Sequence, residues 1–215
     1  MEGGDIIDFV RDFYNLTFSE AVELLLSEQG ISVLPEQTIH QKEKKPFALP
    51  QANPDMRRVY AYLLKRRFLD REVVQFFTHA GLLYEDREFH NAVFVGLDEN
   101  GVPRHAHKRG TYSESGYKGN VEGSEPEYSF HHIGTGNRLY VFEAPVDMLS
   151  YISLHKANWR EHSYVALCSV APHGALHILK TNPHIDTVIT CLDHDGAGIE
   201  GNHRIKEAVL EAGDY

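Results

Sequence analysis

The amino-acid sequence predicts an α/β fold, in which a parallel sheet flanked by helices follows an α+β subdomain and a short N-terminal helical segment. Three observations indicate this. From residue 138 onward, short apolar runs alternate three times with helical segments, as in a doubly wound parallel sheet. Earlier, two helical segments precede two strand-like runs joined by the turn Asp98-Glu-Asn-Gly101. The first 30 residues have helical periodicity.

The N-terminal segment, residues 1–30, is expected to form helices over 5–14 and 18–29. Ser19 is placed to cap the second helix, and Gly30 follows its end. Residues 31–53 contain three prolines and a lysine-rich stretch with little apolar periodicity. This composition predicts a linker.

Residues 54–136 are expected to form the α+β subdomain. Asn53-Pro54-Asp55 provides a cap and a first-turn proline for one helix, and Asp70 opens the next. Two strands are predicted around the turn, at 91–97 and 102–108. Residues 109–127 have no regular period, and one more short strand is expected at 127–133.

Residues 137–215 are expected to form the parallel sheet. Its predicted strands are 139–142, 164–169 and 187–192, and its predicted helices are 145–156, 172–182 and 197–212. The sequence ends at Tyr215, where another strand would follow in such a sheet. We therefore expect the sheet to continue beyond this residue.

Carboxylates follow two of these strands directly: Glu143 after the first, and Asp193 and Asp195 after the third. A right-handed crossover would bring the two strand ends together, where ligands bind in open parallel sheets. Strand alternation would place Asp193 and Asp195 on the same side. Three clustered carboxylates need a cation, and hard oxygen ligands suit Mg²⁺ or Mn²⁺. The pattern predicts a metal site for phosphoryl transfer.

Structural alternatives exist for these acids. Asp193 and Asp195 could cap the following helix, but their pairing with Glu143 favours the metal site. Asp147, four residues after Glu143, could contact metal or complement the dipole of its own helix, and both readings remain open.

Composition limits the function classes. The net charge of −10 argues against a protein whose whole surface binds nucleic acid, although a local basic groove is compatible with it. Basic residues cluster at 42–45, 57–58 and 65–67. We slightly favour a solvated linker and helix face for them over a phosphate-binding stripe. The sequence has no apolar run of membrane-spanning length and no signal peptide, and both cysteines lie in apolar runs. We expect a cytoplasmic protein with no membrane association and reduced core cysteines.

Histidines and aromatic residues are ambiguous. His105 and His107 share one face of a predicted strand, but no further ligand has matching spacing, so exposed histidines are expected. Tyr112, Tyr117 and Tyr128 with Phe130 could stack on bases of a single strand or pack a small sheet.

The segments Phe-Glu143-Ala-Pro-Val-Asp147-Met-Leu-Ser and Leu-Asp193-His-Asp195-Gly-Ala-Gly198 resemble the Toprim domain of bacterial primases, topoisomerases and related nucleases. In that family, a strand-end Glu acts with an Asp-x-Asp pair at a Mg²⁺ site. The resemblance, over residues 137–215, implies that Glu143, Asp193 and Asp195 are the metal-binding and catalytic acids.

The order of motifs upstream is similar to the amino-terminal part of the bacterial primase catalytic core. Arg109 and Lys118 match basic residues that line the nucleotide and template site there. The arrangement resembles primase-like proteins of mobile elements, in which a domain of unknown function precedes Toprim. Residues 3–29 resemble the tail of a primase zinc-binding domain, but its Cys and His ligands are missing from this sequence, so no zinc is expected.

The resemblance implies a primase-type nucleotidyltransferase in the full-length protein. Its expected partners are single-stranded template DNA and nucleoside triphosphates, and a helicase or relaxase could assemble with it. A Toprim-type metal-dependent nuclease and a non-catalytic DNA-binding module are the alternatives. Topoisomerase activity is less expected, because the sequence has no recognisable nucleophilic-tyrosine module.

Overall fold

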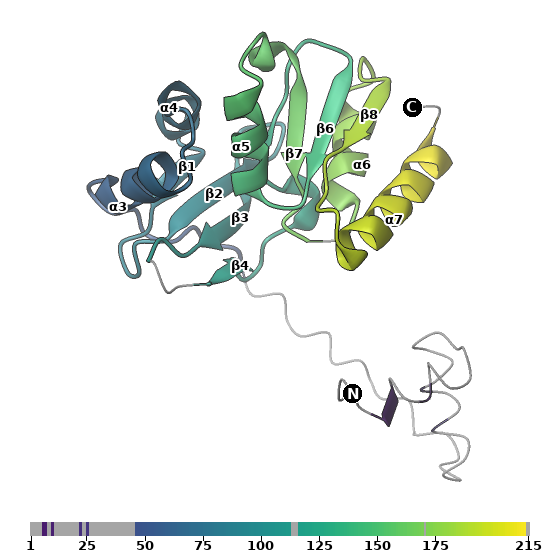
Figure 1. Cartoon of the computed structure of the whole chain (residues 1–215), viewed down its shortest axis with the longest axis horizontal. Coiled ribbons are helices and arrows are strands. Elements are labelled where there is room, and N and C mark those ends of the chain that lie inside the picture. Colours follow the sequence, from purple (N-terminus) through teal and green to yellow (C-terminus); the bar gives the residue numbers. More distant parts are fainter. Residues whose placement is uncertain are drawn as a thin grey trace. The chain divides into compact units, whose positions relative to one another are not determined.

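The computed structural model describes residues 46–112, 116–169 and 171–213, with positions 6, 7, 10, 22 and 25. The chain divides into two compact units, 1–44 and 45–215, and the second contains every element named below (Figure 1). Apart from those five helical positions, the expected N-terminal helices and the linker up to residue 45 lie outside the described residues.

The first part of this unit is a helical pair packed on an antiparallel sheet. Helix α3 (Arg57–Tyr60) continues directly into the π-helical turn η1 (Ala61–Arg66), and α4 (Arg71–His79) follows. The sheet has the order β1-β2-β3-β4. Its strands are β1 (Leu83–Glu85), β2 (Ala92–Leu97), β3 (Pro103–Arg109) and β4 (Lys118–Asn120). The expected hairpin is present between β2 and β3, whereas β4 lies in a segment for which the sequence indicated no regular structure.

The two helices begin in different ways. Asp70 caps α4 as expected, because its Oδ1 accepts hydrogen bonds from the backbone of Glu72 (2.9 Å) and Val73 (3.3 Å). Asp55 Oδ1 accepts from the backbone N–H of Arg57 at 3.0 Å, but the cap expected at Asn53 is not formed. The Asn53 backbone N–H instead donates to the Glu85 carbonyl at 2.8 Å, beside β1. The Glu85 carboxylate accepts from the backbone of Arg58 (3.0 Å) and Val59, so α3 is capped by a residue distant in sequence.

The second part is a mixed sheet with the order β5-β7-β6-β8. Strands β6 (Arg138–Phe142), β7 (Ser163–Ala166) and β8 (Thr187–Thr190) are parallel, and β5 (His131–His132) runs antiparallel to β7. The helical elements are η2 (Pro126–Tyr128), α5 (Pro145–Leu154), η3 (Trp159–Glu161), α6 (His173–Thr181) and α7 (Gly196–Ala212). These elements confirm the expected α/β class. The strand expected at 127–133 is reduced to β5, with η2 before it.

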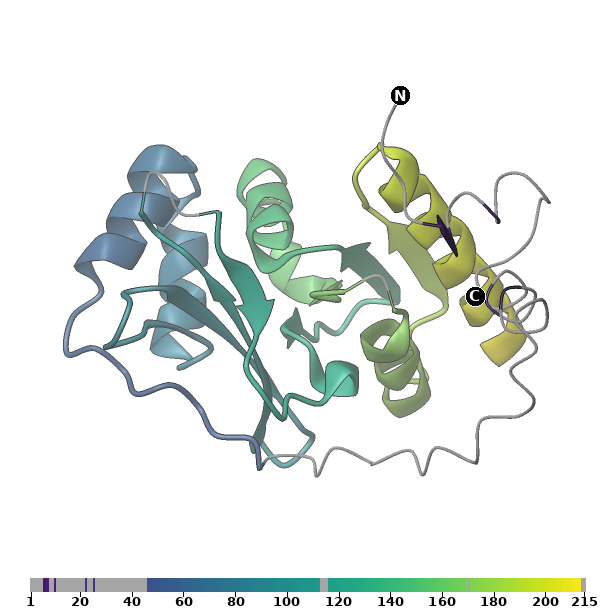
Figure 2. The ribbon, with the colours of Figure 1, turned by 90° about the horizontal axis from the view of Figure 1, so that it is seen from below.

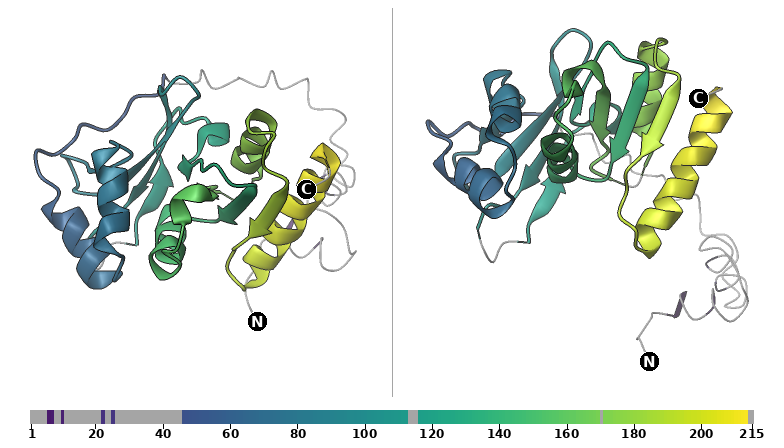
Figure 3. Two further views of the ribbon diagram at one scale, coloured as in Figure 1. Left: turned by 90° about the horizontal axis from the view of Figure 1, so that it is seen from above. Right: turned by 45° about the horizontal axis from the view of Figure 1, so that its top comes forward.

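Helices cover both faces of the parallel strands (Figures 1 and 2). Tyr140 and Phe142 face a core that contains α5, whereas Leu139 and Val141 face a core that contains α6 and α7. Figure 3 shows the same separation of α5 from α6 and α7. Strand β6 lies between β7 and β8. The connection after β6 leads through α5 to β7 on one side of it, and the connection after β7 leads through α6 to β8 on the other side. The carboxyl ends of β6 and β8 therefore meet at a topological switch point, where α/β sheets bind ligands.

One hydrophobic core joins the two parts. It contains Val59, Leu63, Val73, Val74 and Phe77 from the helical pair, Phe94 from β2, Phe130 from the connecting segment, and Tyr140, Phe142, Met148 and Leu149 from the second part. Phe130 is fully buried and its ring centroid lies 5.3 Å from that of Phe94 and 5.1 Å from that of Phe77. This shared core holds β2, and with it the paired strand β3, in a defined position relative to β6.

The prediction that His105 and His107 are exposed is wrong. Both are buried, with 0% and 6% exposure. His105 pairs across the ladder with Gly96, and a Cβ at Gly96 would lie 1.6 Å from the carbonyl oxygen of Tyr128. The backbone around η2 thus covers this face of β2 and β3. The sequence predicts the two strands of the hairpin but not the distant segment that packs on them.

Candidate active site

Glu143 and Asp193 line one cavity of about 190 Å³ at the switch point. Strands β6 and β8 pair in parallel with Val141 opposite Thr190, so the segments that leave them are adjacent. Glu143 follows β6 directly and is half-buried, whereas Asp193 lies three residues beyond β8 and is exposed. The structure therefore brings together two acids that are fifty residues apart in the sequence.

Asp195 does not line this cavity. Its Oδ1 accepts a hydrogen bond from the backbone N–H of Gly198 at 2.8 Å and caps α7. Strand β8 ends at Thr190, two residues earlier than expected, so strand alternation does not extend to Asp193 and Asp195. The turn is tight, because a Cβ at Gly198 would lie 1.9 Å from the carbonyl oxygen of Asp193.

Asp147, in the first turn of α5, also lines the cavity. Burial is the main cause that raises the pKa of its carboxyl, and the negative charges of Asp193 and Glu143 raise it further. Arg67 and Arg109 act in the opposite direction. The three carboxylates are thus close enough to influence one another.

Basic side chains from the first part of the unit face these acids. The cavity is lined by Arg67 at the end of η1, Arg109 at the end of β3 and Lys118 at the start of β4. The β3–β4 ladder places Arg109 opposite Lys118. Lys118 Nζ lies 3.8 Å from Glu143 Oε1, and Arg109 Nε donates to the Tyr62 hydroxyl at 3.2 Å. Three cations and three carboxylates therefore share one small cavity.

Two cavity residues, Arg67 and His107, were not assigned to the active site from the sequence, although His107 was considered there as one of a pair of metal ligands. Arg67 belongs to a basic cluster that was read as solvated, because helical periodicity does not reveal which end of a helix meets a distant strand. His107 lies two residues before Arg109 on β3, so strand alternation places both on the same face and could have identified it. Its Nδ1 is paired with Asn120 Oδ1 at 2.8 Å.

The donor set is chemically suited to a hard divalent cation, since Mg²⁺ and Mn²⁺ prefer carboxylate oxygens. Within the described ranges, however, no three candidate ligands lie close enough together to hold a metal ion. The acids supply the right kind of ligand without forming a closed set.

Two family models match the chain. Residues 61–136 match a family described as a protein of unknown function (DUF3991), and residues 140–215 match one described as Toprim-like. An uncharacterised protein of Bacillus anthracis is 27% identical in an alignment that covers 91% of this chain. The chain spans 60% of that relative's length.

Solved structures with this fold include primases. The primase fragment of the bacteriophage T7 primase-helicase protein is 16% identical, with a TM-score of 0.52 over 67% of this chain and 59% of that chain. The zinc-binding and RNA polymerase domains of Aquifex aeolicus primase are 17% identical, with a TM-score of 0.50 over 99% of this chain and 63% of that chain. These likenesses show a shared fold. Among the described helices, none is long and apolar enough to cross a membrane.

Proposed function

Because the chain carries a DUF3991 domain followed by a Toprim-like domain, we propose that it forms the catalytic core of a primase-like enzyme, which transfers nucleotidyl groups on a nucleic-acid template with a divalent metal. We further propose boundaries at 54–136 and 137–215 for its two domains, after an N-terminal segment of residues 1–30 and a linker of residues 31–53.

One observation supports this function above the others. Acids at the carboxyl ends of β6 and β8 share a cavity with three cationic side chains from the first part of the unit. A nucleoside triphosphate is a polyanion that binds metal, so it requires both kinds of group at once. A site for an uncharged ligand would have no need of this arrangement.

The chain's own residues divide the work. Glu143 and Asp193, with Asp195 or Asp147 as a further ligand, would hold Mg²⁺ or Mn²⁺, which polarises phosphoryl oxygens when bound. Arg109, Lys118 and Arg67 are placed to neutralise the triphosphate charge. The 3.8 Å distance between Lys118 Nζ and Glu143 Oε1 supports this, since it brings a cationic and an acidic side chain together in the cavity.

The setting is also a proposal. We expect single-stranded DNA as template and nucleoside triphosphates as substrates, in the replication or transfer of a mobile element. A helicase or relaxase is the expected partner, and the T7 relative is itself described as a primase-helicase protein. No zinc is expected in this chain.

Template-dependent synthesis of short products, with Mg²⁺ or Mn²⁺, tests the proposal in the whole protein. Glu143→Gln and Asp193→Asn each remove one carboxylate charge and should abolish synthesis, whereas Glu127→Gln, an exposed acid on η2, should leave it unchanged. Mn²⁺ binding followed by electron paramagnetic resonance should weaken in the same two variants. Synthesis that survives both substitutions would overturn the assignment.

The role of Asp195 is resolved separately. If it serves only as the α7 cap, Asp195→Asn keeps an accepted capping residue and most of the synthesis. If it is a metal ligand, the same substitution should abolish synthesis without lowering the melting temperature. Strand cleavage without nucleotide incorporation would identify a nuclease, and nucleic-acid affinity without either activity would identify a binding module.

A further inference from the structure

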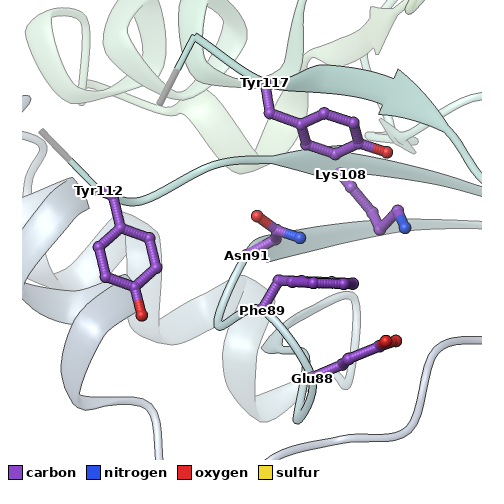
Figure 4. A pocket seen from close by; sticks show the side chains of 6 residues that line it. All are labelled: Glu88, Phe89, Asn91, Lys108, Tyr112 and Tyr117. Carbon is purple, nitrogen blue, oxygen red and sulfur yellow. The ribbon is translucent and has the colours of Figure 1, made fainter. Parts of the chain in front are cut away.

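A second cavity, of about 370 Å³, is shown in Figure 4. It lies on the opposite face of β3 from the candidate active site. It is lined by Glu88, Phe89, Asn91, Lys108, Tyr112 and Tyr117. Successive strand residues point to opposite faces, so Lys108 faces this cavity while His107 and Arg109 face the other. One strand therefore contributes to both.

Three half-exposed aromatic rings surround this cavity. Phe89 is 56% exposed, Tyr112 51% and Tyr117 47%. Figure 4 shows the three rings arranged around Asn91, from three different segments of the chain. Single exposed aromatic residues are common on protein surfaces, but several that converge on one hollow indicate a binding site. We call these three rings the aromatic slot.

Hydrogen bonds fix the loop that carries Phe89. Asp86 accepts hydrogen bonds from the backbone N–H of Phe89 at 2.7 Å and from Asn91 Nδ2 at 2.8 Å. Thr111 Oγ1 donates to the carbonyl of His90 at 2.7 Å, which ties this loop to the residue before Tyr112. Phe89 is thus presented to solvent by a well-connected loop whose acid, Asp86, is itself buried.

Cations accompany two of the rings. The Arg58 guanidinium lies 4.8 Å from the centroid of the Tyr112 ring, and Arg66 donates to the Tyr112 carbonyl at 3.1 Å. Lys108 Nζ lies 5.6 Å from the Tyr117 centroid. Within the described part of the chain Lys108 forms no salt bridge, although Glu88 lines the same cavity, so the Lys108 ammonium is available to a phosphate.

The hollow continues beyond the slot. An adjoining cavity of about 430 Å³ shares Glu88, Phe89 and Lys108 and extends over Gln51 and Arg87. A groove built from two such hollows offers room for more than one nucleotide. Rings for bases, with cations beside them for phosphates, are what sequence-tolerant binding of a single strand requires.

We propose that the aromatic slot binds a base of single-stranded nucleic acid by stacking, with Lys108 on a neighbouring phosphate. The template role of that strand rests on the proposed function, whereas the binding itself does not. Strand β3 then connects a base-holding site on one face with phosphate-binding Arg109 on the other.

The test measures the affinity of the whole protein for a fluorescein-labelled oligothymidylate by anisotropy, in buffer with EDTA so that metal-dependent steps are silent. Phe89→Ala and Tyr112→Ala should each weaken binding about tenfold. Tyr112→Phe keeps the ring and should retain affinity. Phe68→Ala is the matched control, because Phe68 is a more exposed ring (83%) outside the slot. Circular dichroism checks that every variant is folded.

Two further measurements separate bases from charge. An abasic oligonucleotide of equal length should bind weakly and be insensitive to Phe89→Ala. Lys108→Gln should weaken binding. It should also reduce by about one the slope of the logarithm of the binding constant against the logarithm of the salt concentration. A 2-aminopurine base in the oligonucleotide should be quenched on binding to the wild type and less so to Tyr112→Ala.

The proposal is overturned if the ring variants bind as the wild type does, which would leave the slot to a protein or another ligand. It is also overturned if Phe68→Ala weakens binding equally, or if the abasic strand responds in the same way. Strand binding is measured in EDTA, where metal-dependent synthesis cannot occur. Failure of synthesis and failure of the slot are therefore separate results.

Discussion

His105 is the basis of our most quantitative prediction. It is fully buried in β3, and neither of its ring nitrogens has a hydrogen-bond partner within the described residues. Burial is the main cause that lowers its pKa to about 4, and the charges of His107 and His131 act in the same direction. The folded protein therefore keeps this imidazole neutral where an unfolded chain would protonate it.

The direction of the effect on stability follows from proton linkage. In the unfolded chain the imidazole titrates near its model value of 6.5, so below that pH the unfolded state binds a proton that the folded state excludes. Stability is complete above that pKa and is lost as pH falls toward 4. The full lowering of the His105 pKa corresponds to about 3 kcal/mol of unfolding free energy. Roughly 2 kcal/mol of that stability should be lost between about pH 7.5 and about pH 5.

Urea unfolding followed by circular dichroism over this pH range measures the loss. His105→Leu removes the group and the two unpartnered nitrogens, so this variant should lose about 2 kcal/mol less than the wild type on acidification. His79→Gln, which changes an exposed histidine at the end of α4, should follow the wild type. Equal losses in the wild type and His105→Leu would refute the reasoning, because the remaining acids and histidines are common to both proteins.

Three further substitutions test the packing and the caps. Gly96→Ala should cost about 3 kcal/mol in urea unfolding or prevent folding, since the added Cβ would lie 1.6 Å from a backbone oxygen of Tyr128, and near-normal stability would contradict this. Glu85→Ala should cost about 3 kcal/mol, because two N–H groups at the start of α3 lose their acceptor, and it is measured in the same way against Glu88→Ala, on the neighbouring loop. Asp70→Ala should cost about 1 kcal/mol through loss of the α4 cap, and an unchanged melting temperature would exclude that role.

Much of the fold could be predicted from local pattern. The β2–β3 hairpin, the Asp70 cap and the three strand–helix units each depend on residues that are close in sequence, and the structure contains all of them. The bounds differ by a few residues, as for β8, which ends at Thr190. Segment 118–120 has no strand pattern of its own and becomes a strand by pairing with β3.

The candidate site was predictable in part. Strand-end position indicated Glu143 and Asp193, and the structure places both in one cavity. The same reasoning could not distinguish Asp195 as a ligand from Asp195 as a cap, because both uses favour an acid before a helix. The sequence offered Tyr112 and Tyr117 as candidates for stacking on bases, but Phe89 joins them from a distant loop, so no single stretch of sequence shows all three rings of the aromatic slot.

The sequence by itself determined the α/β class, the β2–β3 hairpin, the three strand–helix units after residue 137, and the acids that follow their strands, because periodicity and capping act over a few residues. The tertiary structure alone decided which histidines are buried, that Glu85 caps α3, and that Arg67 faces the acids. Each of these depends on a partner contributed by a distant segment. Burial and electrostatic environment are properties of the packed chain, so local pattern cannot supply them.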